Sequence, residues 1–132
     1  MPMTNALPIT SLYAAVFGLI LVPITLRVGF RRIVTSIFFL DGGDEILLRR
    51  IRSHANFLEY VPIALILMAL TELAGAPAPY LHALGGTLLA ARVIHYLTLN
   101  ISPLAPTRAI GMLGTFAAIL MGSGWLLYRA IG

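Results

Sequence analysis

Long apolar runs separated by short polar or turn-forming stretches dominate the chain. Each of these runs is long enough to cross about 30 Å of hydrocarbon at roughly 1.5 Å per helical residue. No stretch alternates apolar and polar residues as a half-buried strand would. The runs cover approximately residues 7–26, 44–73, 80–99 and 107–130. The pattern therefore predicts an all-α, integral membrane four-helix bundle, folded as a single domain over residues 1–132.

Local signals support the boundaries of the second and fourth runs. Asp44 and Glu45 suit the N-terminus of a helix, and Gly75 suits its end. The helix between them exceeds what a membrane requires, so its first two turns are predicted to project from the lipid. In the fourth run small residues recur every four positions, which predicts close helix packing; they are Gly114, Ala118 and Gly122.

Composition favours lipid as the solvent of this chain. It has 132 residues, of which 59% are hydrophobic and 11% charged, and a mean hydropathy of +0.93. Cysteine is absent, which excludes disulfides and thiolate metal sites. The three histidines lack the spacing of metal ligands, so no metal site is expected.

All nine basic residues are arginines, and all but Arg92 lie near the ends of the apolar runs. This placement argues against a basic face for nucleic acid, despite the net charge of +4. Six arginines flank the connection between the first and second runs, and Arg108 follows the connection between the third and fourth; Arg129 alone lies near the opposite side. The positive-inside rule predicts that the arginine-rich loops are cytoplasmic and that both termini lie on the other side.

A polar stripe lies in the second run, within RSHANFLEYVP at residues 52–62. Arg49, Arg52, Asn56 and Glu59 are spaced by 3, 4 and 3 residues, which places them on one side of a helix. Tyr60 lies beside Glu59 on that side. His54 points well away from the stripe, so a helix at a subunit boundary would use both faces.

Glu59 needs a partner, because an ionisable group deep in a span costs about 2.5–3.5 kcal/mol on insertion scales. Arg92 in the third run is the expected partner, since it too has apolar neighbours on both sides. One interpretation is a structural ion pair that fixes helix register. That pair leaves Asn56, Tyr60 and the two nearby histidines, His54 and His95, unexplained. Several donors with one carboxylate suit a small ligand that carries both charge types.

These residues resemble the signature of the MAPEG family, the membrane-associated proteins of eicosanoid and glutathione metabolism. The signature has Arg, then Gln or His, Asn, Glu, Tyr and Pro at fixed spacing; here these are Arg52, His54, Asn56, Glu59, Tyr60 and Pro62. A second block, Ala91-Arg92-Val93-Ile94-His95 followed by residues 103–108, is similar to the microsomal glutathione transferases and their bacterial relatives. The resemblance extends over nearly the whole chain.

The resemblance implies a homotrimer in the bacterial inner membrane, with glutathione as co-substrate bound between neighbouring subunits near the cytoplasmic boundary. Arginine forks would hold the tripeptide carboxylates, and Glu59 would take its ammonium group. Arg108 matches the catalytic arginine that holds the sulfur as thiolate. The implied glutathione-binding residues are Arg27, Arg49, Arg52, His54, Asn56, Glu59, Tyr60, Arg92 and His95.

The chain departs from the family pattern at particular positions. Leu99 stands where many members place a tyrosine near the sulfur, and His95 stands where leukotriene synthases have another. Losing a phenol removes one hydrogen bond to the developing thiolate, which predicts modest activity. The loop over residues 31–43 differs in length from several members.

The leading functional hypothesis is a membrane glutathione transferase that acts on a lipophilic electrophile, with hydroperoxide reduction as a second activity. The electrophile itself is not encoded in any recognisable motif, because ordinary apolar side chains would line its pocket. One alternative is a non-catalytic scaffold of the same family that binds lipid or glutathione. Another is a structural four-helix membrane protein whose charges only pair with one another.

Overall fold

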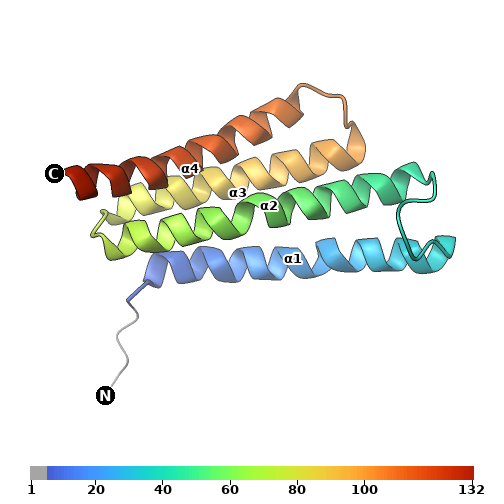
Figure 1. Cartoon of the computed structure of the whole chain (residues 1–132), viewed down its shortest axis with the longest axis horizontal. Coiled ribbons are helices and arrows are strands. Elements are labelled where there is room, and N and C mark those ends of the chain that lie inside the picture. The colour runs from blue at the N-terminus through green and yellow to red at the C-terminus, as the bar shows by residue number, and fades with distance from the viewer. Residues whose placement is uncertain (1–5) are drawn as a thin grey trace, which may run out of the picture.

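Within residues 6–132, four helices connected by short loops make up the fold (Figure 1). The computed structural model describes residues 6–132. The helices are α1 (Pro8–Thr35), α2 (Glu45–Leu73), α3 (Ala78–Ile101) and α4 (Thr107–Ile131). They run alternately up and down, so the α1–α2 and α3–α4 connections lie at one end of the bundle. The predicted all-α class is confirmed.

Three of the helices, α1, α2 and α4, are long and apolar enough to cross a membrane. The α3 helix has 24 residues, which is sufficient length. Its apolar run is interrupted by His82, Arg92 and His95, and these polar side chains lower its mean hydropathy. That α3 also crosses the membrane therefore stays a prediction.

The ends of α2 follow the local signals in the sequence. Asp44 caps the helix, because its carboxylate accepts a hydrogen bond of 2.6 Å from the backbone N–H of Leu47. At the other end Gly75 adopts a φ of 80°, the left-handed conformation that ends many helices. The predicted beginning and end of this helix are thus confirmed.

The α1 helix extends beyond the apolar run that predicted it. The apolar run ends at Leu26, whereas the helix, which Pro23 does not interrupt, continues to Thr35. Ser36 ends it with a φ of 56°. Charge ends a hydrophobic run but does not end a helix, because arginine is a good helix former. Arg27, Arg31 and Arg32 are therefore helical residues and not loop residues.

A polar clamp near each end helps to hold α1 against α2. At the end with the α1–α2 loop, Arg31 donates to Asp44 through Nη2 at 2.6 Å and through Nε at 3.1 Å. The Arg31 guanidinium and the Leu47 N–H lower the pKa of the Asp44 carboxyl. At the other end, the Glu72 carboxylate accepts from the backbone N–H groups of Ile9 at 2.9 Å and Thr10 at 2.7 Å. Glu72 thereby satisfies donors that a helix N-terminus leaves open.

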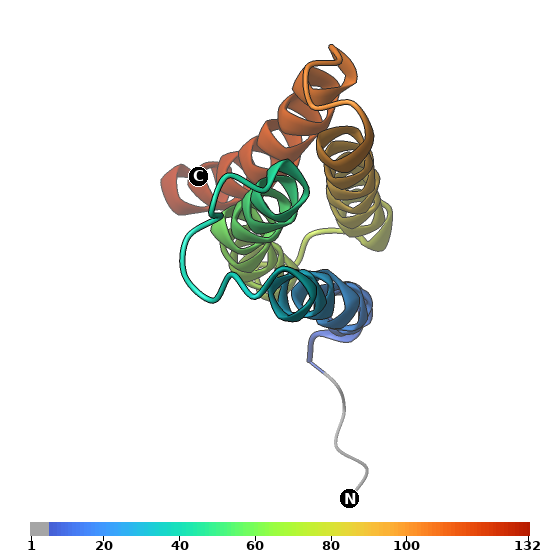
Figure 2. The same ribbon diagram turned by 90° about the vertical axis from the view of Figure 1, so that its right-hand side faces the viewer.

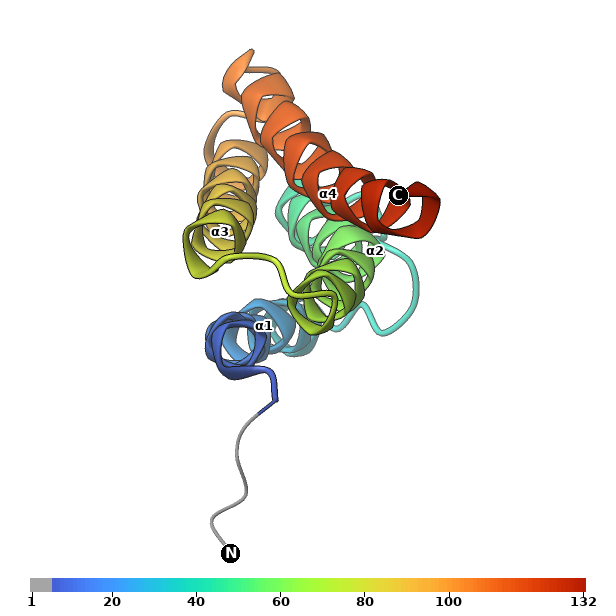
Figure 3. The same ribbon diagram turned by 90° about the vertical axis from the view of Figure 1, so that its left-hand side faces the viewer.

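The apolar core lies along the inner faces of the four helices, with α2 in contact with each of the others. Views from the two ends show α2 between α1 and α4, while α3 lies to one side (Figures 2 and 3). Many large apolar side chains point outward and remain exposed, as expected for a lipid-facing surface. The core residues are Phe17, Ile24, Phe57, Val61, Ala64, Met68, Leu81, Leu84, Leu88 and Ala118.

Close packing between α3 and α4 depends on glycine. A Cβ at Gly111 would lie 2.7 Å from the Cβ of His95 and 3.0 Å from the carbonyl oxygen of Ala91. A Cβ at Gly114 would lie 2.9 Å from the Cβ of Ala91. Gly122 plays the same role toward α2, at 3.1 Å from Leu67 Cβ. The predicted row of small residues is thus a packing surface, and Gly111 is a further member of that surface.

We expect Gly111→Ala to lower the free energy of unfolding by about 1–3 kcal/mol, because the added methyl group overpacks the α3–α4 contact. Gly124→Ala is the matched control, since no atom lies within 4 Å of the Cβ that it would add. That control should be neutral or slightly stabilising, because alanine favours a helix over glycine. Thermal unfolding in detergent, followed by circular dichroism, compares the two variants. Equal stability of the two variants would show that α3 and α4 can accommodate the added methyl group without loss of stability.

Candidate functional site

A polar cavity lies where the arginine-rich ends of α2, α3 and α4 meet. Its volume is about 190 Å³, and it is lined by Arg52, Asn56, His95, Leu99 and Arg108. All four polar members are residues that the sequence predicted for the site. His95 is only 3% exposed, whereas Arg52 and Arg108 are exposed. The cavity therefore joins a buried imidazole to two arginines at its outer edge.

Arg92 forms the inner support of this cavity. It is 3% exposed, and its guanidinium donates 2.6 Å to Oδ1 of Asn56 and 3.3 Å to the carbonyl oxygen of Gly111. The guanidinium carbon also lies 5.5 Å from the centroid of the Tyr60 ring, in cation–π contact. Through these contacts Arg92 of α3 connects α2 with α4. It fixes the amide of Asn56, whose side chain then lines the cavity.

The expected ion pair between Glu59 and Arg92 is wrong for this chain. Glu59 is exposed on α2, and no ion pair joins it to another residue within 6–132. The Asn56 amide and the Gly111 carbonyl take the place of a carboxylate around Arg92. Asn56 lies one turn before Glu59 and closer to the inner face of α2, so it reaches the guanidinium first.

Other predicted residues lie outside the cavity. Arg49 is paired with Glu45 at 3.4 Å, one turn nearer the start of α2. His54 does point away from the stripe, and its Nε2 lies 3.1 Å from the hydroxyl of Thr25 on α1. Arg27 also belongs to the α1 side, where its Nη1 donates 2.8 Å to the hydroxyl of Tyr96. Arg27 and His54 thus face a different side of the subunit from Arg108.

Three polar residues near the site were not predicted. The amide of Asn100 donates 3.2 Å to the hydroxyl of Ser53 and 2.8 Å to the carbonyl oxygen of Tyr96, which links α3 to α2 beside the cavity. Tyr96 itself holds Arg27. A signal for Tyr96 did exist, since it follows Arg92 by four residues and thus lies one turn further along the helix.

The cavity suits an anionic, hydrogen-bonding group. Arg52 and Arg108 supply two positive charges at its edge, and within residues 6–132 neither forms an ion pair. The described residues that line it include no carboxylate. A carboxylate or thiolate bound there would meet guanidinium groups directly, and these stabilise the charged form of both.

Comparisons with known proteins agree with the sequence motifs. The model of the MAPEG family matches residues 10–128. Inner membrane protein YecN of Escherichia coli strain K12 is 35% identical over 113 residues, which cover 86% of this chain and 86% of that protein. The protein of the same name in Escherichia coli O6:H1 strain CFT073 gives the same values. No solved structure matches the chain significantly.

We expect Asn56→Ala to lower the free energy of unfolding by roughly 1.5–3 kcal/mol, because it removes the acceptor of a charged hydrogen-bond donor. Asn100→Ala is the matched control, since the Asn100 amide bonds only neutral partners within the described chain. It should cost less, roughly 0.5–1.5 kcal/mol. Thermal unfolding in detergent measures both. A smaller loss for Asn56→Ala than for Asn100→Ala would contradict the supporting role of Arg92.

Proposed function

The chain belongs to the MAPEG family, and from this premise we propose that it is a membrane-bound glutathione transferase. It conjugates the glutathione thiolate to lipophilic electrophiles and also reduces lipid hydroperoxides. The observation that carries the proposal is the polar cavity, because it gathers Arg52, Asn56, His95 and Arg108 from three helices. Four residues predicted for one ligand share one cavity although they are up to 56 positions apart.

In this proposal Arg108 is the catalytic residue. The thiolate of glutathione is the nucleophile, and a guanidinium beside it favours the ionised sulfur over the thiol. Arg52 binds a carboxylate of the tripeptide as a two-pronged donor. Asn56 and His95 offer hydrogen-bonding groups from the inner side of the cavity. The thiolate attacks the electrophilic carbon, which forms a thioether and releases the leaving group.

The exposed Glu59 supports a homotrimer with glutathione bound between subunits. A carboxylate on the outer face of an apolar helix is costly in lipid unless a partner outside the chain meets it. The ammonium group of a tripeptide held against a neighbouring subunit is such a partner. His54 lies on the α1 side, so it would reach the tripeptide from the neighbour across this boundary.

The structural position of Leu99 favours a second candidate function. Leu99 lines the cavity with an apolar side chain where many family members place a phenol near the sulfur. A protein that binds glutathione or lipid without turning it over would tolerate this replacement.

The proposed location is the bacterial inner membrane, as the name of the Escherichia coli relative states for that protein. The arginine-rich end would face the cytoplasm and the termini the opposite side.

Glutathione should raise the melting temperature of the detergent-solubilised protein, because a ligand that binds only the folded state stabilises it by mass action. At a ligand concentration of about 100 Kd the stabilisation is roughly 2.7 kcal/mol. S-methyl glutathione should act likewise, whereas the dipeptide Cys-Gly should shift the melting temperature less, since it lacks the γ-glutamyl group that Glu59 would hold. The absence of a shift with either tripeptide at millimolar concentration would reject the proposed function.

Arg108→Leu should separate catalysis from binding. We expect the variant to keep most of its glutathione affinity, to lose the ultraviolet absorbance of the bound thiolate, and to lose turnover by about tenfold or more, which corresponds to about one pKa unit of the thiol. The matched control is Arg129→Leu, which removes an exposed arginine at the opposite end of α4. If Arg108→Leu keeps full thiolate signal and full turnover, Arg108 is an ordinary interfacial arginine.

A further inference from the structure

A second, apolar cleft lies on the other side of Arg92, between α1 and α3. Its volume is about 360 Å³, and it is walled mainly by aliphatic side chains, with Phe57 of α2 at its base. The base is buried, since Phe57 and Ile24 are each 5% exposed. The rim is open, since Leu19 is 75% exposed and Val93 43%. The cleft therefore opens sideways, onto the surface that faces lipid in a membrane protein.

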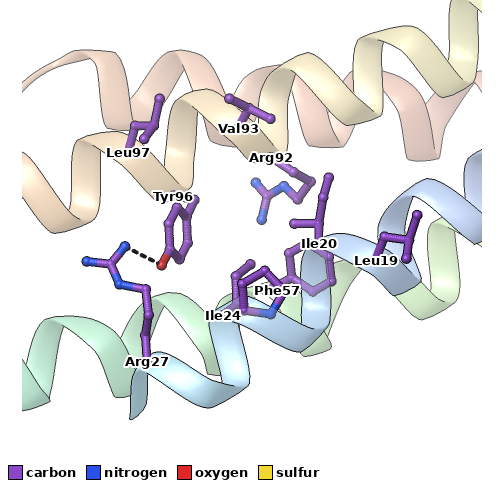
Figure 4. Close-up of a pocket in the computed structure, with 10 residues that line it drawn as sticks. Leu19, Ile20, Ile24, Arg27, Phe57, Arg92, Val93, Tyr96 and Leu97 are labelled. Carbon is purple, nitrogen blue, oxygen red and sulfur yellow. Dashed lines mark hydrogen bonds between the residues drawn. The ribbon is translucent and has the colours of Figure 1, made fainter. Parts of the chain in front are cut away.

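Polar groups occur at two levels of this cleft. Figure 4 shows Arg27 and Tyr96 at one end and Leu19 at the other, with Arg92 between them. Tyr96 and Arg92 are four residues apart on α3, which separates the two levels by about 6 Å along the helix. Beyond Arg92 the described walls are apolar.

The outer level carries free positive charge. Arg27 is exposed, and within residues 6–132 its guanidinium donates one hydrogen bond, from Nη1 to the hydroxyl of Tyr96. Arg50 lies beside it, because its guanidinium donates 2.8 Å to the carbonyl oxygen of Arg27. The nearest acidic groups are already engaged, since Asp44 is paired with Arg31 and Glu45 with Arg49. An anion at the end of the cleft would meet the Arg27 guanidinium, and Arg50 adds positive charge behind it.

The inner level carries a buried donor that lacks an acceptor. Arg92 is 3% exposed, and its Nε has no hydrogen-bond partner among the described residues, although its Nη1 and Nη2 are satisfied. A buried unpaired donor of a charged group destabilises the fold. Because Nε is itself buried, the Arg92 side chain would turn toward the cleft to donate to a ligand oxygen, and this bond would remove the penalty.

We propose that the α1–α3 cleft binds an anionic glycerophospholipid. Its phosphate lies against Arg27, with Arg50 behind it, an ester carbonyl oxygen accepts from Arg92 about one helical turn deeper, and an acyl chain follows Ile20 and Leu19. The two polar levels favour this ligand over a free fatty acid, which has a single polar end. The arginine-rich end of the bundle is also where lipid phosphates lie. The site is distinct from the polar cavity, which Arg108 marks on the other side of Arg92.

Native mass spectrometry of the detergent-purified protein tests the proposal. Phosphatidylglycerol is the probe, and phosphatidylcholine and oleate are added separately for comparison. Val93→Trp fills the rim of the cleft, and Ile94→Trp is its matched control, because Ile94 is similarly exposed at 38% but does not line the cleft. Arg27→Gln removes the outer charge, and Arg129→Gln is the control at the opposite end.

We expect phosphatidylglycerol to remain bound to the wild-type protein and to both controls. Val93→Trp should lose it, and Arg27→Gln should weaken it about fivefold, which corresponds to the roughly 1 kcal/mol that one arginine adds near an anionic lipid surface. Equal binding of phosphatidylcholine, stronger binding of oleate, or undiminished binding in both Val93→Trp and Arg27→Gln would overturn the proposal. If Val93→Trp instead dissociates the oligomer, the cleft seats a second copy of the chain and the lipid assignment is wrong.

Discussion

A single buried cation, the guanidinium of Arg92, fixes how α2, α3 and α4 pack against one another. Removing such a group from water costs several kcal/mol, and this cost is offset only if hydrogen bonds surround the charge. The structure supplies an amide from α2, a backbone carbonyl from α4 and the face of an aromatic ring. Gly111 serves twice here, since its missing side chain lets α3 and α4 approach and its carbonyl oxygen faces the cation. The same residue, Gly111, therefore sets the spacing of α3 and α4 and helps to compensate the buried charge of Arg92.

The position of Arg92 also divides the subunit into two chemical environments. On one side lies a polar cavity edged by Arg52 and Arg108, and on the other an apolar cleft open to the surroundings. The guanidinium touches both, since Asn56 belongs to the cavity and Arg92 itself lines the cleft. A ligand in the cavity or in the cleft would therefore contact the same hydrogen-bonded pair, Asn56 and Arg92.

Most of the fold and about half of the site followed from the sequence, for reasons that particular residues make clear. The cap at Asp44 and the stop at Gly75 were predictable, because they depend on local backbone chemistry. The partner of Arg92 was not, because helical angles fix the side on which Asn56 and Glu59 lie but not which of them turns inward. The end of α1 was also missed, since hydropathy follows the lipid boundary while hydrogen bonds continue the helix. Contacts between distant helices, such as Arg27 with Tyr96, need the tertiary packing to become visible.

The Glu72 clamp has a consequence for biosynthesis. The first amide groups of α1 are capped by a carboxylate that follows them by more than sixty residues. During translation α1 therefore emerges before Glu72, and the bonds to Ile9 and Thr10 form only once α2 is complete. The Arg31–Asp44 pair forms much earlier, beside the loop that joins the two helices. We therefore expect the contacts between α1 and α2 to form from the loop toward the Glu72 end. The two helices should pack together before α3 and α4 dock against them.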